Sequence, residues 1–135
     1  MEIQKYFRGN WRSPETFMIL LAVAMPLSFS TWMALINNFA IERAAFTGVE
    51  IGILQSLREI PGFLAFAVVF LLLLMREQTL ALVSLLLLGI GTAITGALPS
   101  VVGLYATTVL MSLGFHYYET VRQSLALQWV DKANA

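Results

Sequence analysis

The run QTLALVSLLLLGIGTAITGALPSVVGLYATTVLMSLGFHYY, residues 78–118, lies between Glu77 and Glu119 and contains no charged residue. As a single helix it would be about 60 Å long at 1.5 Å per residue, twice the thickness of the hydrocarbon core of a bilayer. The segment Gly96-Ala97-Leu98-Pro99-Ser100 divides the run. Proline pushes the residue before it out of helical geometry, and serine can cap a new helix. The run therefore predicts two membrane-spanning helices joined by a short turn.

The composition of the whole chain agrees with a membrane location. Of the 135 residues, 59% are hydrophobic and only 12% are charged, and two further uncharged gaps separate Glu15 from Glu42 and Glu59 from Arg76. Such a composition excludes a disordered tail and a basic module that binds nucleic acid. The chain has no cysteine, which excludes a disulfide-stapled secreted domain. An integral membrane protein is expected, with the lipid bilayer as its surroundings and no nucleic-acid partner.

The gaps predict an all-α polytopic membrane protein with four transmembrane helices. Ser13, Pro14 and Glu15 indicate the first helix start, with an N-cap, a proline at the first position and an acid in the first turn. The fourth helix is expected to begin at Val101 or Leu104. The predicted segments are a cytoplasmic tail (1–13), helix 1 (14–38), an outer loop (39–48), helix 2 (49–74), a cytoplasmic loop (75–79), helix 3 (80–98), an outer turn (99–103), helix 4 (104–129) and a cytoplasmic end (130–135).

The distribution of basic residues predicts the orientation, because Lys and Arg are enriched in short cytoplasmic loops. With both termini in the cytoplasm, only Arg43 falls outside. The other basic residues used for this assignment fall inside or near the inner face: Lys5, Arg8, Arg12, Arg76, Arg122 and Lys132. An inner (plasma) membrane location with both termini cytoplasmic is therefore expected.

Four charged residues lie within the predicted helices, namely Arg58, Glu59, Glu119 and Arg122. A charge at hydrocarbon depth costs about 2.5 to 3.5 kcal/mol on insertion scales, so these side chains are expected to face protein or water. Either they line a functional cavity or they form structural ion pairs, and Arg122 can alternatively snorkel to the headgroups. Because Arg58 and Glu59 are neighbours in sequence, each is expected to need a partner on another helix. For Arg58, that partner would be Glu119 or a solute anion.

Helix 4 carries a polar stripe at helical spacing, consisting of Thr108, Ser112, His116, Glu119 and Gln123. Such a stripe lines a water-filled pathway or seals a helix contact with hydrogen bonds. His116 and Glu119 are the pair that can exchange a proton near neutral pH. Gln55 shares a face of helix 2 with Glu59, and Trp32 lies in the outer half of helix 1. The candidate residues for a translocation path are Arg58, Glu59, Gln55, His116, Glu119, Arg122 and Trp32.

Two further patterns concern helix packing. Pro61-Gly62 follows the charged pair directly and predicts a bend, which would act as a hinge or shape a cavity. In helix 3, Gly89, Ala93 and Ala97 recur every four residues and predict a packing seam.

No motif for catalysis or metal binding is visible. The chain has one histidine, no phosphate-binding loop of the G-x-x-x-x-G-K-[ST] type and no G-x-S-x-G elbow. No catalytic residue, metal or cofactor is therefore expected, and an enzyme is not expected.

The segments TGVEIGIL (47–54) and GFHYYETVRQSL (114–125), together with the order of helices and loops, resemble the N-terminal third of a major facilitator superfamily transporter. Leu71 to Leu80 keeps only Arg76 of that family's G-x-L-x-D-R-x-G-R-R loop, and the basic residue of its fourth helix would fall at Leu110. The resemblance implies part of a six-helix N-terminal bundle within about twelve helices, with the substrate site between two similar halves. It implies a partial protein that moves a small polar solute by alternating access. Its implied partners are the solute, a proton or other coupling ion, and the missing C-terminal helices or a partner chain.

Two other functions fit the same pattern of helices. One is a complete four-helix exporter like the small multidrug resistance proteins, which act as dimers around a membrane carboxylate. The other is a non-transporting membrane subunit whose buried charges pair with a partner helix.

Overall fold

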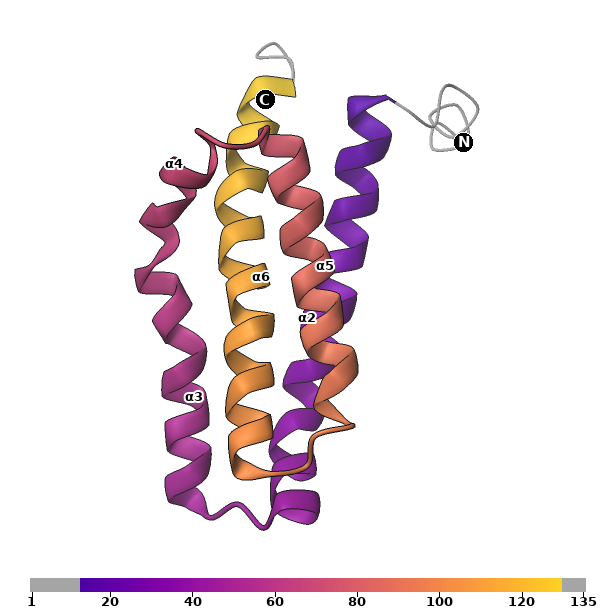
Figure 1. Cartoon of the computed structure of the whole chain (residues 1–135). Coiled ribbons are helices and arrows are strands. Elements are labelled where there is room, and N and C mark those ends of the chain that lie inside the picture. Colours follow the sequence, from indigo (N-terminus) through magenta and orange to yellow (C-terminus); the bar gives the residue numbers. More distant parts are fainter. Residues whose placement is uncertain (1–12, 130–135) are drawn as a thin grey trace, which may run out of the picture.

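The computed structural model describes residues 13–129, and every regular element in that range is helical (Figure 1). The long helices are α2 (Pro14–Ala44), α3 (Gly48–Phe63), α5 (Glu77–Thr95) and α6 (Val101–Trp129). A 3₁₀ turn, η1 (Ala65–Ala67), and the short helix α4 (Val68–Leu71) follow α3. The all-α prediction is confirmed for these residues. Residues 1–12 of the predicted tail and the predicted end 130–135 lie outside the described range.

Consecutive long helices run in opposite directions, and α6 packs against α5, α3 and α2 (Figure 1). The start of α2, the end of α6 and the turn between α4 and α5 share one end of the molecule. The loops at 45–47 and 96–100 share the other end. The short loops thus join helices that are neighbours in sequence, and α6 takes the central position.

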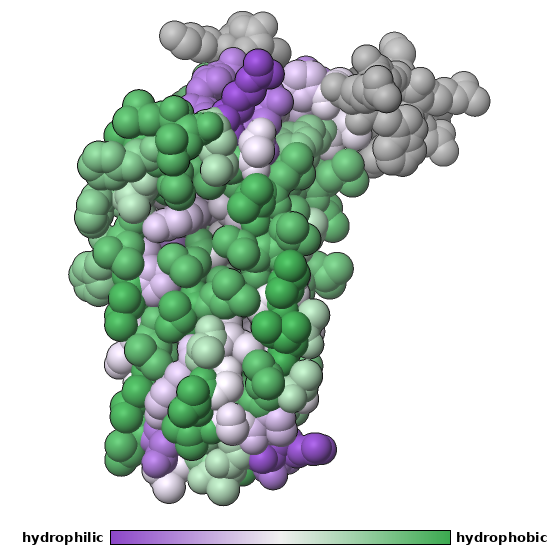
Figure 2. Space-filling view, viewed as in Figure 1, coloured by the Kyte–Doolittle hydropathy of each residue, from purple (hydrophilic) through white to green (hydrophobic). Residues whose placement is uncertain are grey.

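Three helical segments are long and apolar enough to cross a membrane: Pro14–Ala44, Gly48–Leu71 and Glu77–Thr95. α6 has 29 residues, which is ample length, but its threonine, serine and histidine side chains make it less apolar than these three. Because α6 packs on three other helices, much of its surface meets protein rather than lipid. Large apolar side chains cover much of the face shown in Figure 2, with hydrophilic residues at its two ends. These features are those of an all-α membrane protein.

The helix bounds differ from the predicted spans at several places. α2 continues through 39–44 and ends where Ala45 takes a left-handed conformation, with φ 54°. The predicted outer loop 39–48 is therefore reduced to residues 45–47, because residues 39–44 include no glycine or proline that would end the helix. α5 begins and ends three residues earlier than the predicted third span, 80–98, and α6 begins at Val101.

The predicted second helix, 49–74, is interrupted after Phe63. Pro61 has no amide hydrogen to continue the helical pattern. The amide of Leu64 bonds to the carbonyl of Pro61 at 3.1 Å, and that of Ala67 to the carbonyl of Leu64 at 2.9 Å. These bonds span three residues, which tightens the backbone into η1. The bend predicted from Pro61-Gly62 thus occurs as a 3₁₀ turn just beyond the two residues.

α5 and α6 approach each other through glycine. A Cβ atom at Gly114 of α6 would lie 2.4 Å from the amide nitrogen of Leu88 and from the carbonyl oxygen of Ser84. A Cβ atom at Gly91 of α5 would lie 2.7 Å from the amide nitrogen of Met111. The predicted seam is wrong, because all three of its residues are exposed: Gly89, Ala93 and Ala97.

The start of α2 follows the prediction. Ser13 Oγ accepts a hydrogen bond from the amide of Thr16 at 3.1 Å, and Pro14 occupies the first turn. The cap satisfies one of the amides that a helix start leaves without a partner.

Removing this cap is expected to lower the free energy of unfolding by about 1 kcal/mol in the S13A variant. The measurement is equilibrium unfolding of the purified protein in mixed detergent micelles with increasing dodecyl sulfate. The S30A variant is the matched control, because Ser30 is exposed on the same helix. Equal unfolding free energies for S13A and S30A would contradict a stabilising role for the cap.

Candidate functional site

Arg58 and Glu59 form an ion pair near the middle of the segment Gly48–Leu71. Arg58 Nη2 lies 2.6 Å and Arg58 Nε 3.0 Å from Glu59 Oε1. The prediction that these neighbours cannot pair is wrong. Their Cα–Cβ bonds diverge by about 100° around the helix, but the long arginine side chain folds back to the carboxylate. The two side chains are 21% and 53% exposed, so the described helices enclose neither completely.

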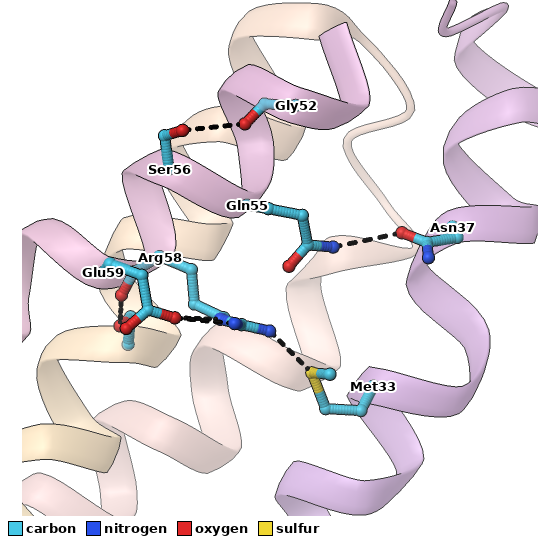
Figure 3. A network of polar contacts seen from close by, with 8 residues as sticks. Met33, Asn37, Gly52, Gln55, Ser56, Arg58 and Glu59 are labelled. Carbon is cyan, nitrogen blue, oxygen red and sulfur yellow. Dashed lines mark hydrogen bonds and ion pairs between the residues drawn. The ribbon is translucent and has the colours of Figure 1, made fainter. Parts of the chain in front are cut away.

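Two polar contacts connect α3 to α2 beside this ion pair (Figure 3). Arg58 Nη1 lies 3.0 Å from the sulfur of Met33, and Gln55 Nε2 donates to Asn37 Oδ1 at 3.2 Å. In Figure 3 the side chains of Arg58 and Gln55 extend from α3 toward α2. Met33, Asn37, Gln55, Arg58 and Glu59 are called the Arg58 site below.

The polar stripe of α6 lies partly against α3. The hydroxyl of Ser112 donates to the main-chain carbonyl of Arg58, and Thr108 and Ser112 are both buried. The ring of His116 faces Gly62, where an added Cβ would lie 3.0 Å from His116 Cε1. This part of the stripe seals a helix contact, the packing alternative. It also fixes the backbone that carries the Arg58 side chain.

Glu119 and Arg122 form a second ion pair within α6. Arg122 Nε lies 3.1 Å from Glu119 Oε1, and Nη2 lies 2.9 Å from Oε2, which is a two-pronged contact. Arg58 and Glu119 do not pair, and no hydrogen bond joins His116 to Glu119 among residues 13–129. The charges predicted to line one route thus form two separate local pairs.

Trp32 lies in the apolar core rather than at the Arg58 site. Its side chain is 3% exposed and belongs to a cluster with Ile36, Leu54 and Met111, which come from α2, α3 and α6. Its indole Nε1 is buried without a hydrogen-bond partner in the described part of the chain. This position makes Trp32 a packing residue between three helices.

Two residues of the site were missed by the sequence analysis, namely Met33 and Asn37. Asn37 was assigned to the end of helix 1 beside a polar connection, although it lies four residues after Met33 and so on the same helical face. A third polar cluster lies at the end of the bundle, where Glu77 accepts from Ser124 Oγ at 3.1 Å and Gln128 Nε2 at 2.8 Å. It ties the start of α5 to the end of α6.

Within residues 13–129, no three His, Cys, Asp or Glu side chains are grouped as metal ligands. Comparisons with protein-family models, with curated proteins and with solved structures find no match for this chain. The Arg58 site is the feature of the described residues that points to a function.

Proposed function

We propose that this chain belongs to a secondary transporter of the major facilitator type, which moves a small polar solute across a membrane by alternating access. The observation that carries the proposal is the Arg58–Glu59 ion pair. It lies near the middle of an apolar segment and remains partly exposed in the bundle. Charged groups at this depth are stable when water, a solute or another helix covers them.

The proposal treats α6 as a fourth membrane-crossing helix. Its central position and its length support this assignment, since contact with three helices replaces contact with lipid. With four crossings, both termini of the chain would lie in the cytoplasm, as we also propose. In support, the start of α2 and the end of α6 lie at the same end of the bundle as Arg76, while Arg43 lies toward the other end.

The resemblance to the major facilitator superfamily supports the type of transporter, and the uncovered Arg58 site supports the need for further helices. In that arrangement, helices contributed by the rest of the transporter or by a partner chain would face α2 and α3 across the solute path. The α6 residues beside the solute path would then be His116 and the ion pair of Glu119 with Arg122.

A non-transporting membrane subunit is the second candidate, and one observation favours it. Arg58 and Arg122 each already have a carboxylate partner on their own helix. Arg58 Nη2 lies 2.6 Å from Glu59 Oε1, and Arg122 Nη2 lies 2.9 Å from Glu119 Oε2. Pairs satisfied in this way need no solute and can be held by a partner helix.

The proposal is tested by thiol labelling, for which the absence of cysteine in the chain provides a clean background. We expect the Q55C variant to react with a membrane-impermeant maleimide added from either side of right-side-out and inside-out vesicles, because alternating access wets the site from both faces. The I53C variant is the control, since Ile53 is an exposed apolar residue on the same helix and would face lipid. The labelling of I53C is expected to be much slower, because a charged reagent enters the hydrocarbon region only at a high cost in free energy.

Labelling of Q55C from neither side would contradict the transporter and favour the non-transporting subunit. Labelling from one side only would contradict alternating access.

A further inference from the structure

The Arg58 site contains one cation and one anion side by side, and each is only partly used. Both hydrogen bonds from the guanidinium end on the same carboxylate oxygen, Glu59 Oε1. No described residue donates a hydrogen bond to Glu59 Oε2. The remaining arginine nitrogen, Nη1, is directed at the sulfur of Met33, which is a weak acceptor. The pair therefore retains a free acceptor on one side and an underused donor on the other.

We propose that the Arg58 site binds a small zwitterion, with the solute carboxylate on Arg58 Nη1 and the solute ammonium on Glu59 Oε2. This inference rests on the proposed function and specifies its substrate class. A carboxylate is a stronger acceptor for Nη1 than a thioether, so the solute would replace the contact with Met33. The bond between Arg58 and Glu59 through Oε1 stays in place.

The charge balance of the site selects against simple ions. A lone anion would gain from Arg58 but would lie beside the carboxylate of Glu59, 2.6 Å from the guanidinium, and a lone cation would meet the reverse. Only a solute that carries both charges pairs with both groups and leaves the net charge of the site at zero. Gln55 and Asn37, one helical turn away on α3 and α2, offer amide groups to an uncharged part of the solute.

A zwitterionic lipid headgroup has the same pair of charges. The site lies ten residues into α3 from Gly48, roughly 15 Å along the helix axis, which places it below the level of headgroups. A free solute is therefore the occupant that we propose, and the experiment separates it from lipid.

The test compares three probes of similar size on the full chain purified in maltoside detergent without added lipid. Alanine carries both charges, propionate lacks the ammonium and ethylammonium lacks the carboxylate. Calorimetric titration is expected to show that alanine binds at least about tenfold more tightly than either of the others. Preference for propionate or ethylammonium, or binding of none of the three, would overturn the proposal. Alanine affinity that falls when phosphatidylcholine is added to the micelles would show that the lipid headgroup occupies the same site, which would contradict a free solute as its occupant.

Neutralising one charge of the pair at a time gives a sharper readout than loss of binding, because it should change which probe the site prefers. The E59Q variant leaves a cationic site and is expected to favour propionate, whereas R58Q leaves an anionic site and is expected to favour ethylammonium. The R43Q variant is the control, because Arg43 lies at the end of α2 and should leave the preference for alanine unchanged. If E59Q and R58Q lost affinity for all three probes equally and kept the same order of preference, the Arg58–Glu59 pair would not contact the solute.

The outcomes separate this inference from the proposed function. Two-sided labelling of Q55C with a preference for propionate would retain the transporter and reject the zwitterion. Alanine binding without labelling from the second side would retain the binding site and reject alternating access.

Discussion

Replacing Gly114 by alanine is expected to lower the free energy of unfolding by about 3 kcal/mol, because a new methyl group has no room between α5 and α6. It would lie 2.4 Å from the amide nitrogen of Leu88 and from the carbonyl oxygen of Ser84. Both are backbone atoms of a helix, so no side-chain rotation relieves the overlap. The helices must move apart, which loses the van der Waals contact that holds membrane helices together.

The measurement for G114A is equilibrium unfolding in mixed micelles, with the thermal midpoint of the detergent-solubilised protein as a second readout. The matched control is G89A, because a Cβ atom at Gly89 meets nothing within 4 Å. Alanine has the higher helix propensity, so G89A is expected to be neutral or slightly more stable. A loss of stability in G89A as large as that in G114A would show that helix contact is not the cause.

The contrast between Gly114 and Gly89 shows how far sequence patterns determine packing. Gly89, Ala93 and Ala97 would share one face of the predicted helix 80–98, but α5 ends at Thr95 and Ala97 lies in the turn that follows. The face that packs is instead lined by Ser84, Leu88, Gly91 and Thr95, which are buried. A spacing of four residues defines a stripe along one face of a helix, but it does not determine which neighbouring helix packs on that stripe.

The helices themselves follow from the sequence for a physical reason. In a bilayer the backbone must satisfy its own hydrogen bonds, so a long uncharged run has to be helical. The break at Gly96–Ser100 and the Ser13 cap were predictable because proline and serine act locally. The length of α2 was not, since Asn37-Asn38 and Glu42-Arg43 suggest a loop, and yet residues 37–44 contain nothing that stops a helix.

The composition of the Arg58 site was predictable only in part. The cost of burying charge identified Arg58 and Glu59 as residues that need partners. Their pairing depends on side-chain rotamers, because the arginine folds back along its own helix. The contribution of Met33 and Asn37 depends on how α2 lies against α3, which no local pattern of either helix contains.

The attachment of α3 to the bundle is expected to depend strongly on Leu54. Leu54 is fully buried and, with Pro61, is one of two buried residues in α3, in a cluster that includes Trp32 and Met111. We expect the L54A variant to lose about 2 kcal/mol of stability. The estimate is at the low end of the range for leucine because lipid is as apolar as the core. The loss then comes from the cavity rather than from transfer out of water.

Cross-linking between α2 and α3 measures this attachment directly. In an N37C/Q55C background, a short bifunctional thiol reagent should join the two helices rapidly, because the native side chains approach to 3.2 Å. Adding L54A is expected to slow the reaction measurably, because α3 has few buried residues and the loss of this one lowers the docked population of the helix. Adding I53A instead should leave the rate unchanged, because Ile53 is exposed on the same helix. Equal rates with L54A and I53A would mean that α3 is held by the hydrogen bond from Ser112 to the carbonyl of Arg58 and not by its apolar core.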